Sequence, residues 1–600
     1  MKKYKTYWPA GSALILFSMS ALCLANTSLE NRPIDPARAD PRAFWHYANA
    51  LYAQQMGEVD RSLVEFQQAA RYDSKSSAIH DRLAYHYYVE GMDAKSAEEL
   101  QTSIELAPDN IETRLLLANL FASQGEYGKS QKEYQKILQM APKNIEARYY
   151  LAGVLANQNR NEEALQKYQE ILNENPKAAA VYYNMGLIYT RANQVTKAED
   201  TFKKAITIDP TLESAYTSLG LVYELDQKPK EAIETYQALV KVNPDNNRAF
   251  LALGELYYNQ KDDEKALEAF QHYSVLKPED LSVNDYIGLC YFHLRQFPQA
   301  VEAFQKLVDS PTAKTPPSGD KTGTPKPVVN ALVRYRLAAA YEEMKDFPKA
   351  EEQLQDILQN DDKSVDAWVR LAMLYDKEKN GAAAEKAIQD GLKASPNHPD
   401  LILMQAMVYH EKNDFKKAEE SYQKAIEIEL NFKNKKTADF NVGSLTQARF
   451  NLGVLLDKQG RFNEAMDQMK KVIELQPNNP DAYNYIGYSY ADKGIQLDDA
   501  RKYVENALKL DPDNSYYLDS LGWVYYQKGL YKEAREQLDR SLKFLKTTVK
   551  DDAVIYDHLA EVLMKMGQKD EAVEDWQKAL KLDPDNQKYL EKIKKNDIVN

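Results

Sequence analysis

Cysteine is almost absent from this sequence of 600 residues, which contains only Cys23 and Cys290. With Cys23 in the first 25 residues and Cys290 far along the chain, we expect no structural disulfide. Cys290 lies in the apolar stretch IGLCYFHL, where a lone cysteine is expected to be a small buried hydrophobic residue rather than a reactive thiol.

The sequence also lacks a concentration of positive charge. Its formal net charge is -13, and its acidic residues alternate with Lys and Arg along the whole length. A protein that follows a phosphate backbone needs a basic face or stripe. We therefore expect no nucleic-acid partner.

Catalytic and metal-binding motifs are missing as well. The 8 His residues are scattered without neighbouring Cys, and after His410-Glu411 the position of a second zinc-binding His is held by Asp414. No glycine-rich phosphate loop and no GxSxG nucleophile motif occurs. The sequence predicts no enzyme active site, no metal site and no cofactor.

One apolar run stands out, from Ala10 to Ala25, and it follows Lys2, Lys3 and Lys5. A membrane-spanning helix needs about 20 apolar residues, so this shorter run is typical of a secretory signal that is cleaved after Ala25. Residues 1–25 are predicted to be the signal peptide and residues 26–42 an extended, proline-containing spacer. We expect the protein in the periplasm, or on the periplasmic face of the outer membrane, of a Gram-negative-type bacterium.

Cys23 gives an alternative to simple cleavage, because exported bacterial lipoproteins carry a lipidated Cys just after their apolar run. Here Leu22 occupies the place where a small residue is expected, and Ser20 the place where Leu is usual. A lipid on Cys23 would be the only predicted attachment to a membrane.

The strongest pattern is a repeat of 34 residues. Prolines recur at this interval at Pro108, Pro142, Pro176, Pro210, Pro244 and Pro278. Relative to these prolines, one place holds only small residues, namely Ala50, Ala84, Ala118, Ala152, Gly186, Gly220, Gly254 and Gly288. Twelve places later come Ala164, Ala198, Ala232, Ala266 and Ala300, and four places after these come Tyr168, Phe202, Tyr236, Phe270 and Phe304. Each unit is therefore predicted to be a pair of helices that pack closely at the small residues and end at the proline.

This spacing resembles the tetratricopeptide (TPR) repeat family, over about nine tenths of the chain. The resemblance implies an all-α superhelical solenoid of about fifteen helix-turn-helix units. Units 1–8 are expected over residues 43–310 and units 9–15 over residues 328–586, with residues 587–600 as a polar capping helix. A flexible Pro/Thr/Lys-rich insert at 311–327 divides the array into two segments, and a second insert at 431–444 lengthens a link between units.

In this family the first helix of each unit lines the concave surface, and the resemblance implies that side chains there bind a peptide. The candidate binding residues in units 13–15 are Asn484, Tyr488, Asp519, Trp523, Tyr526, Asp557 and Glu561. The candidates in units 4–6 are Tyr149, Tyr183, Asn184, Arg191 and Thr217. Core packing is the competing interpretation at each position.

Residues 480–583 resemble exported bacterial repeat lipoproteins that deliver substrates to carboxyl-terminal processing proteases. Pro512 follows Pro477 by 35 residues instead of 34, and DSLGWVYY and Trp576 come after it. The resemblance implies a non-enzymatic adaptor or scaffold whose partners are other proteins or peptides, with self-association as a further expectation. The alternative is an assembly factor for a pilus, secretion or exopolysaccharide export machine.

Overall fold

The structure is a computed structural model that describes residues 34, 40–310, 331–435, 440–545 and 549–596. Three predicted features lie outside the described residues: the signal peptide, Cys23 and the insert at 311–327. Of the predicted spacer, only Ile34 and residues 40–42 are described. The chain divides into two compact units, Met1–Arg295 and Gln296–Asn600. The division therefore falls before the insert that we took from the sequence as the boundary.

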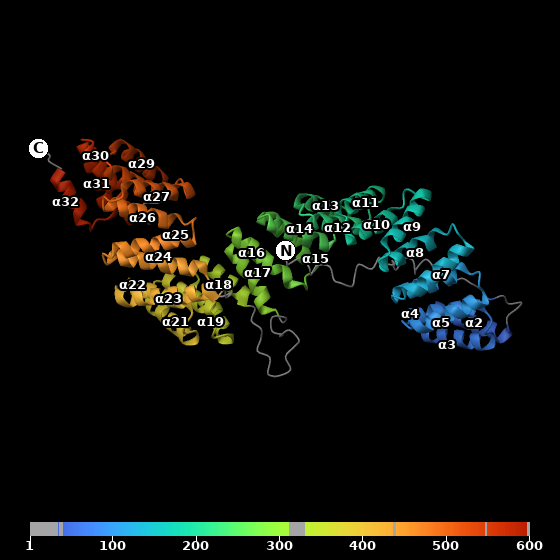
Figure 1. Ribbon diagram of the computed structural model, residues 1–600. Helices are drawn as coiled ribbons and strands as arrows, with labels where there is room; N and C mark the ends of the chain where they lie inside the picture. Colours follow the sequence, from blue (N-terminus) through green and yellow to red (C-terminus); the bar gives the residue numbers. More distant parts are fainter. Residues whose placement is uncertain (1–33, 35–39, 311–330, 436–439, 546–548, 597–600) are drawn as a thin grey trace. The chain divides into compact units, whose positions relative to one another are not determined.

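Unit 1 is built of consecutive helices joined by short turns (Figure 1). They are α2 (Pro41–Gln55), α3 (Val59–Tyr72), α4 (Ser77–Val89), α5 (Asp93–Leu106), α6 (Ile111–Ser123), α7 (Tyr127–Met140), α8 (Ile145–Asn157), α9 (Asn161–Glu174), α10 (Ala179–Arg191), α11 (Val195–Ile208), α12 (Glu213–Leu225), α13 (Pro229–Val242), α14 (Asn247–Asn259), α15 (Asp263–Leu276), the 3-10 helix η2 (Leu281–Val283) and α16 (Asn284–His293).

Unit 2 continues the same pattern. Its helices are α17 (Phe297–Asp309), α18 (Ala331–Glu343), α19 (Phe347–Asn360), α20 (Val365–Lys377), α21 (Gly381–Ala394), α22 (Pro399–Glu411), α23 (Phe415–Lys435), α24 (Val442–Lys458), α25 (Phe462–Leu475), α26 (Pro480–Asp492), α27 (Leu497–Leu510), α28 (Ser515–Gln527), α29 (Tyr531–Phe544), the 3-10 helix η4 (Lys550–Asp552), α30 (Ala553–Lys565), α31 (Lys569–Leu582) and α32 (Gln587–Asn596).

Among the described residues the helix order gives fifteen consecutive pairs followed by α32, and no strand occurs there. The predicted all-α repeat fold is confirmed. No helix in the described ranges is both long and apolar enough to span a membrane.

The boundaries of each pair follow from local chemistry. After the repeat proline, Asn110, Asn144 and Asn246 each accept a backbone N–H from the first turn of the next helix. At the turn inside each pair, a residue such as Gly125 or Asn159 has positive φ, which ends the first helix.

Small residues let the two helices of a pair approach closely. A Cβ built on Gly186 would lie 2.5 Å from the ring of Phe202, and one built on Gly220 would lie 2.4 Å from the ring of Tyr236. Both rings are buried. The repeated small residue and the repeated ring are thus the two sides of one contact within a pair.

The segment at 431–444 differs from the sequence interpretation. Residues 431–435 extend α23, which has 21 residues, and residues 442–444 begin α24. The described part of this segment is therefore mainly added helix rather than a lengthened link. Buried Glu429 holds the junction, because its carboxylate accepts the backbone N–H of Asn441 at 2.9 Å.

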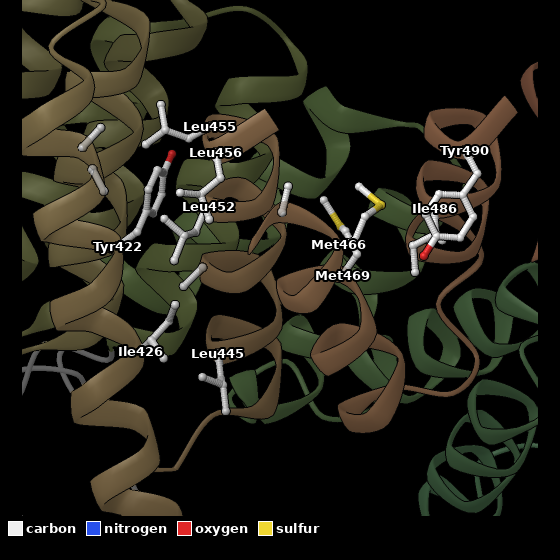
Figure 2. Close-up of a cluster of buried hydrophobic side chains, with 14 of the residues drawn as sticks. Tyr422, Ile426, Leu445, Leu452, Leu455, Leu456, Met466, Met469, Ile486 and Tyr490 are labelled. Atoms are coloured by element: carbon white, nitrogen blue, oxygen red, sulfur yellow. The ribbon is translucent and has the colours of Figure 1, made fainter. Parts of the chain in front are cut away.

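The core of unit 2 is formed where neighbouring pairs meet. Figure 2 shows Tyr422 and Ile426 of α23 beside Leu445, Leu452, Leu455 and Leu456 of α24, and the same cluster continues through Met466, Met469, Ile486 and Tyr490. Because burial runs from one pair to the next, each pair is stabilised chiefly by its neighbours.

Cys290 is buried and free, as predicted. Burial and the nearby Asp263 carboxylate raise the pKa of its thiol to about 12. The thiol is therefore protonated at neutral pH and has the character of a small apolar side chain.

Candidate functional site

Four rings from three successive first helices meet in unit 2 and form what we call the aromatic cluster: Tyr488 of α26, Trp523 and Tyr526 of α28, and His558 of α30. The indole of Trp523 lies between its neighbours. Its centroid is 4.6 Å from that of Tyr526 and 4.1 Å from that of His558, with interplanar angles of 8° and 17°.

The register of the repeat places these rings together. Tyr488 and Trp523 occupy the same place in their helices, each directly after the small residue, Gly487 or Gly522. From that place Trp523 stacks on His558 of the next first helix, α30. The ring centroids of Tyr488 and His558 are 6.2 Å apart, although α28 lies between their helices in the chain.

His558 is held by Asp519, whose carboxylate lies 2.8 Å from the imidazole Nδ1. Both side chains are only 6% exposed. Burial alone would lower the pKa of His558, but the charge and hydrogen bond of Asp519 outweigh it and raise that pKa above its usual value. Asp519 thus favours the charged form of the imidazole that stacks on the indole.

The fold leaves two polar atoms unsatisfied here, one in the cluster and one on α26, a turn before Tyr488. Trp523 Nε1, a donor, and Asn484 Oδ1, an acceptor, are both buried without a hydrogen-bond partner among the described residues. Buried polar atoms without partners are rare in native proteins, and each costs roughly 1–3 kcal/mol. An N–H donor and a carbonyl acceptor are also the two groups that complement a peptide backbone.

Carboxylates at the edge of the cluster are already engaged. Asp557 accepts the indole N–H of Trp576 at 2.8 Å, and Lys592 of α32 pairs with both Asp557 and Glu561. The predicted capping helix therefore brings a cation to two of the predicted binding residues. Burial raises the pKa of the Tyr526 hydroxyl to about 12, and the nearby Glu561 adds to this shift.

The structure thus brings six of the seven predicted residues of units 13–15 into one region, and Asn484 lies one turn before Tyr488 on α26. Tyr488, Trp523 and Tyr526 stay partly exposed, Asp519 is committed to His558, and Asp557 and Glu561 are committed to Lys592. Sequence reasoning missed His558 and Lys592. The only signal for His558 was its place directly after Asp557, a predicted binding residue.

The predicted binding residues of units 4–6 mostly make hydrogen bonds or packing contacts inside the fold. Asn184 is buried and donates to the hydroxyl of Tyr149 at 2.8 Å, and Tyr183 packs against Phe202. Arg191 donates to the Ala156 carbonyl at 2.9 Å, and the Thr217 hydroxyl donates to the Glu213 carbonyl at 3.1 Å. Asn184, Tyr183 and Arg191 are thus engaged between helices and Thr217 within α12, so the aromatic cluster is the better candidate site.

Within the described residues, no group of three or more His, Cys, Asp or Glu side chains is arranged to hold a metal ion. In particular, His410 faces the ring of Tyr422, with 3.5 Å between its Nδ1 and the tyrosine hydroxyl.

Several solved structures are similar to this chain. The APC/C hetero-tetramer Cut9–Hcn1 matches at 15% identity over 87% of this chain and 96% of that chain, with a TM-score of 0.36. A tetratricopeptide repeat protein from Parabacteroides merdae matches at 16% identity over 42% of this chain and 99% of its own, with a TM-score of 0.34. The pilF protein of Pseudomonas aeruginosa matches at 20% identity over 37% of this chain and 96% of its own, with a TM-score of 0.29. No curated protein matches the chain.

Family models described as tetratricopeptide repeat match most of the sequence. The matched residues are 115–178, 179–212, 219–280, 285–312, 343–408, 399–432, 453–494, 487–546 and 553–586. Repeats of this kind are scaffolds for protein–protein interaction. With fifteen helix pairs and repeat matches over more than half of its length, this chain belongs to the tetratricopeptide-repeat family.

Proposed function

We propose that this protein is an exported, non-enzymatic scaffold that holds an extended segment of a partner protein against the aromatic cluster. The observation that carries the proposal is the unsatisfied indole N–H of Trp523, at the centre of stacked rings from three first helices. A peptide carbonyl would supply the acceptor that this donor lacks.

The surrounding chemistry supports a peptide ligand. Tyr and Trp dominate many protein interfaces because each buries a large apolar area and keeps a polar group for hydrogen bonding. Asn484 contributes the second unsatisfied atom, an acceptor that a peptide N–H would complete. A bound peptide would satisfy both atoms with its backbone groups. This part of the binding free energy would therefore not depend on the side chains of the partner.

The role we propose is that of an adaptor in the cell envelope, which presents substrates to a periplasmic protease. Two features support it: the basic and apolar start of the chain, typical of an export signal, and the resemblance of residues 480–583 to adaptors of that kind. The mechanism is passive, because holding protease and substrate on one scaffold raises their effective concentration.

Affinity capture of envelope proteins on the chain without residues 1–25 tests the proposal. The test variant has Tyr488, Trp523 and Tyr526 changed to Ala. The control is Trp45→Ala, because Trp45 is exposed and lies near the start of unit 1. We expect an identified protease or cell-wall hydrolase to be retained by the wild type and the control and to be lost from the triple variant.

Other outcomes are equally informative. Specific recovery of pilus, secretion or export components would replace the adaptor role by an assembly role at the same site. Identical captures by wild type and triple variant would contradict the choice of the aromatic cluster as the binding site.

A further inference from the structure

Four first helices carry an arginine at the same repeat position, four residues before the small residue of the unit. They are Arg114, Arg148, Arg334 and Arg449. The first three form ion pairs with a carboxylate of their own helix pair: Arg114 with Glu133 at 2.6 Å, Arg148 with Glu174 at 2.7 Å, and Arg334 with Asp356 at 2.7 Å.

Arg449 is the exception. Its one hydrogen bond in the described part of the chain runs from Nη1 to the side-chain oxygen of Gln468, at 2.8 Å, and no carboxylate lies within ion-pair distance. Gln468 occupies the position that Glu133 holds opposite Arg114. Gln353 holds the same place opposite Arg334, but Arg334 also has the Asp356 carboxylate, whereas Arg449 has the neutral amide alone.

This guanidinium is also buried. Arg449 is only 9% exposed, and its Nε is buried without a partner. Burial lowers its pKa, although the more distant Asp467 and Glu474 oppose this effect. An uncompensated charge in such a place is unfavourable, and an anion brought to it would be held strongly.

Arg449 lines a cavity of about 810 Å³, a size within the usual range for ligand sites. Part of the wall is the added length of α23, which contributes Asn431 and Asn434. Ile426 and Leu452, which lie close together in Figure 2, form part of its apolar lining.

We propose that this cavity binds a carboxylate carried on a short peptide, with Arg449 as the residue that holds the carboxylate. A guanidinium matches a carboxylate in both charge and planar geometry. The amides of Asn431 and Asn434 and the ammonium group of Lys424 are placed to bind the rest of an acidic peptide. Glu427, the one carboxylate among the described lining residues, would oppose a second acidic group.

The site is separate from the aromatic cluster and does not depend on the function proposed for it. It is formed by α23, α24 and α25, with Asn397 from the turn before α22. The residues that lengthen α23 form part of the cavity wall. The insertion into the repeat thus helps to form the proposed binding site.

Isothermal titration calorimetry with three pentapeptides tests the proposal. One has blocked ends and a central glutamate, one is uncharged in its side chains with a free C-terminal carboxylate, and the third has blocked ends and a central glutamine. We expect the third to bind at least tenfold more weakly than the better of the first two. The first two identify whether a side-chain or a chain-terminal carboxylate is the ligand.

The decisive variant is Gln468→Glu, which gives Arg449 an internal carboxylate at the position that Glu133 holds opposite Arg114. It should weaken binding of the carboxylate peptide at least tenfold without lowering the Tm, so a loss of binding cannot be ascribed to misfolding. Arg449→Gln should also abolish binding, whereas Arg148→Gln should leave it unchanged. Unchanged binding to Gln468→Glu, equal binding of all three peptides, or no binding of either carboxylate peptide would overturn the proposal.

Discussion

The imidazole of His558 stacks on the indole of Trp523, with ring centroids 4.1 Å apart, while its Nδ1 is bonded to Asp519. One residue thereby joins two successive first helices and supports the ring that we place at the centre of the binding site. We therefore expect the protonation state of His558 to affect how firmly the rings of the aromatic cluster are held in place.

We predict that His558 titrates above its usual value of about 6.5. A pKa that is higher in the folded than in the unfolded chain stabilises the fold at low pH, and this contribution is lost as the pH rises through the raised pKa. Nuclear magnetic resonance of the imidazole should show the raised midpoint in the wild type.

Asp519→Asn supplies the matched comparison, because it removes the carboxylate but keeps a side chain of the same shape. Burial then outweighs the remaining, opposing charges of Asp557 and Lys592, and the midpoint should fall below about 6.5. A wild-type midpoint below that of an unfolded peptide would show that Asp519 does not hold a charged imidazole.

His86, near the start of unit 1, should respond to pH in the opposite direction. It is buried against Phe66 and lies 3.2 Å from the Ser62 hydroxyl. Burial lowers its pKa to about 4, and Arg82 adds to the effect. The neutral imidazole therefore stabilises the fold above pH ~6.5, and up to roughly 3 kcal/mol is lost as the pH falls to 4.

Hydrogen exchange of α3 and α4 at pH 7 and pH 5 measures this loss. Wild-type protection should decrease at the lower pH, and His86→Phe, which cannot be protonated, should decrease much less. Equal pH dependence in the two proteins would assign the effect to another group.

The close approach of α26 and α27 predicts that Gly487→Ala is destabilising. Its new Cβ would lie 2.4 Å from Val504 and 2.9 Å from the backbone carbonyl of Ala500, which cannot move aside without shifting the helix. Overpacking of this kind costs about 1–3 kcal/mol. Gly128→Ala, where no atom lies within 4 Å, is the control and should leave stability unchanged or raise it by up to ~1 kcal/mol. Chemical denaturation of both variants checks the difference, and equal midpoints would contradict the close contact.

Glu429 gives a prediction for the lengthened α23. Burial raises the pKa of its carboxyl, so its ionised form is disfavoured and the fold loses stability as the pH rises above the unfolded value. Glu429→Gln removes the charge but keeps an acceptor for the Asn441 N–H, and it should be at least as stable as the wild type at pH 7. Glu429→Ala should increase hydrogen exchange in the last turns of α23, and equal exchange in both variants would show that the junction does not depend on this bond.

The repeat could be predicted from the sequence because its rules are local. The 34-residue proline spacing, the small residue, the alanine twelve places later and the ring sixteen places later each act within one or two helices. The described residues form the fifteen pairs that the spacing predicts. The extra residue before Pro512 is also explained, since the turn after α26 contains two residues with positive φ, Gly494 and Gln496.

The aromatic cluster could be predicted only in part. Trp523 and Tyr526 were found because they share one helix face, whereas the contact of His558 with Tyr488 spans two repeats and depends on the packing of three helix pairs. The engagement of Glu561 by Lys592 depends in the same way on where α32 docks. The length of α23 was missed because residues 431–435 are polar and carry no apolar periodicity.

The most direct test of the account is the affinity of a captured partner for the wild type, for Trp523→Ala and for Trp45→Ala. Trp45 is 60% exposed and lies outside the aromatic cluster, so it controls for the loss of a tryptophan. Truncating a central aromatic residue of an interface typically costs 2 kcal/mol or more. We predict at least tenfold weaker binding to Trp523→Ala and unchanged binding to Trp45→Ala, whereas equal affinity for all three proteins would contradict the assignment of the aromatic cluster as the binding site.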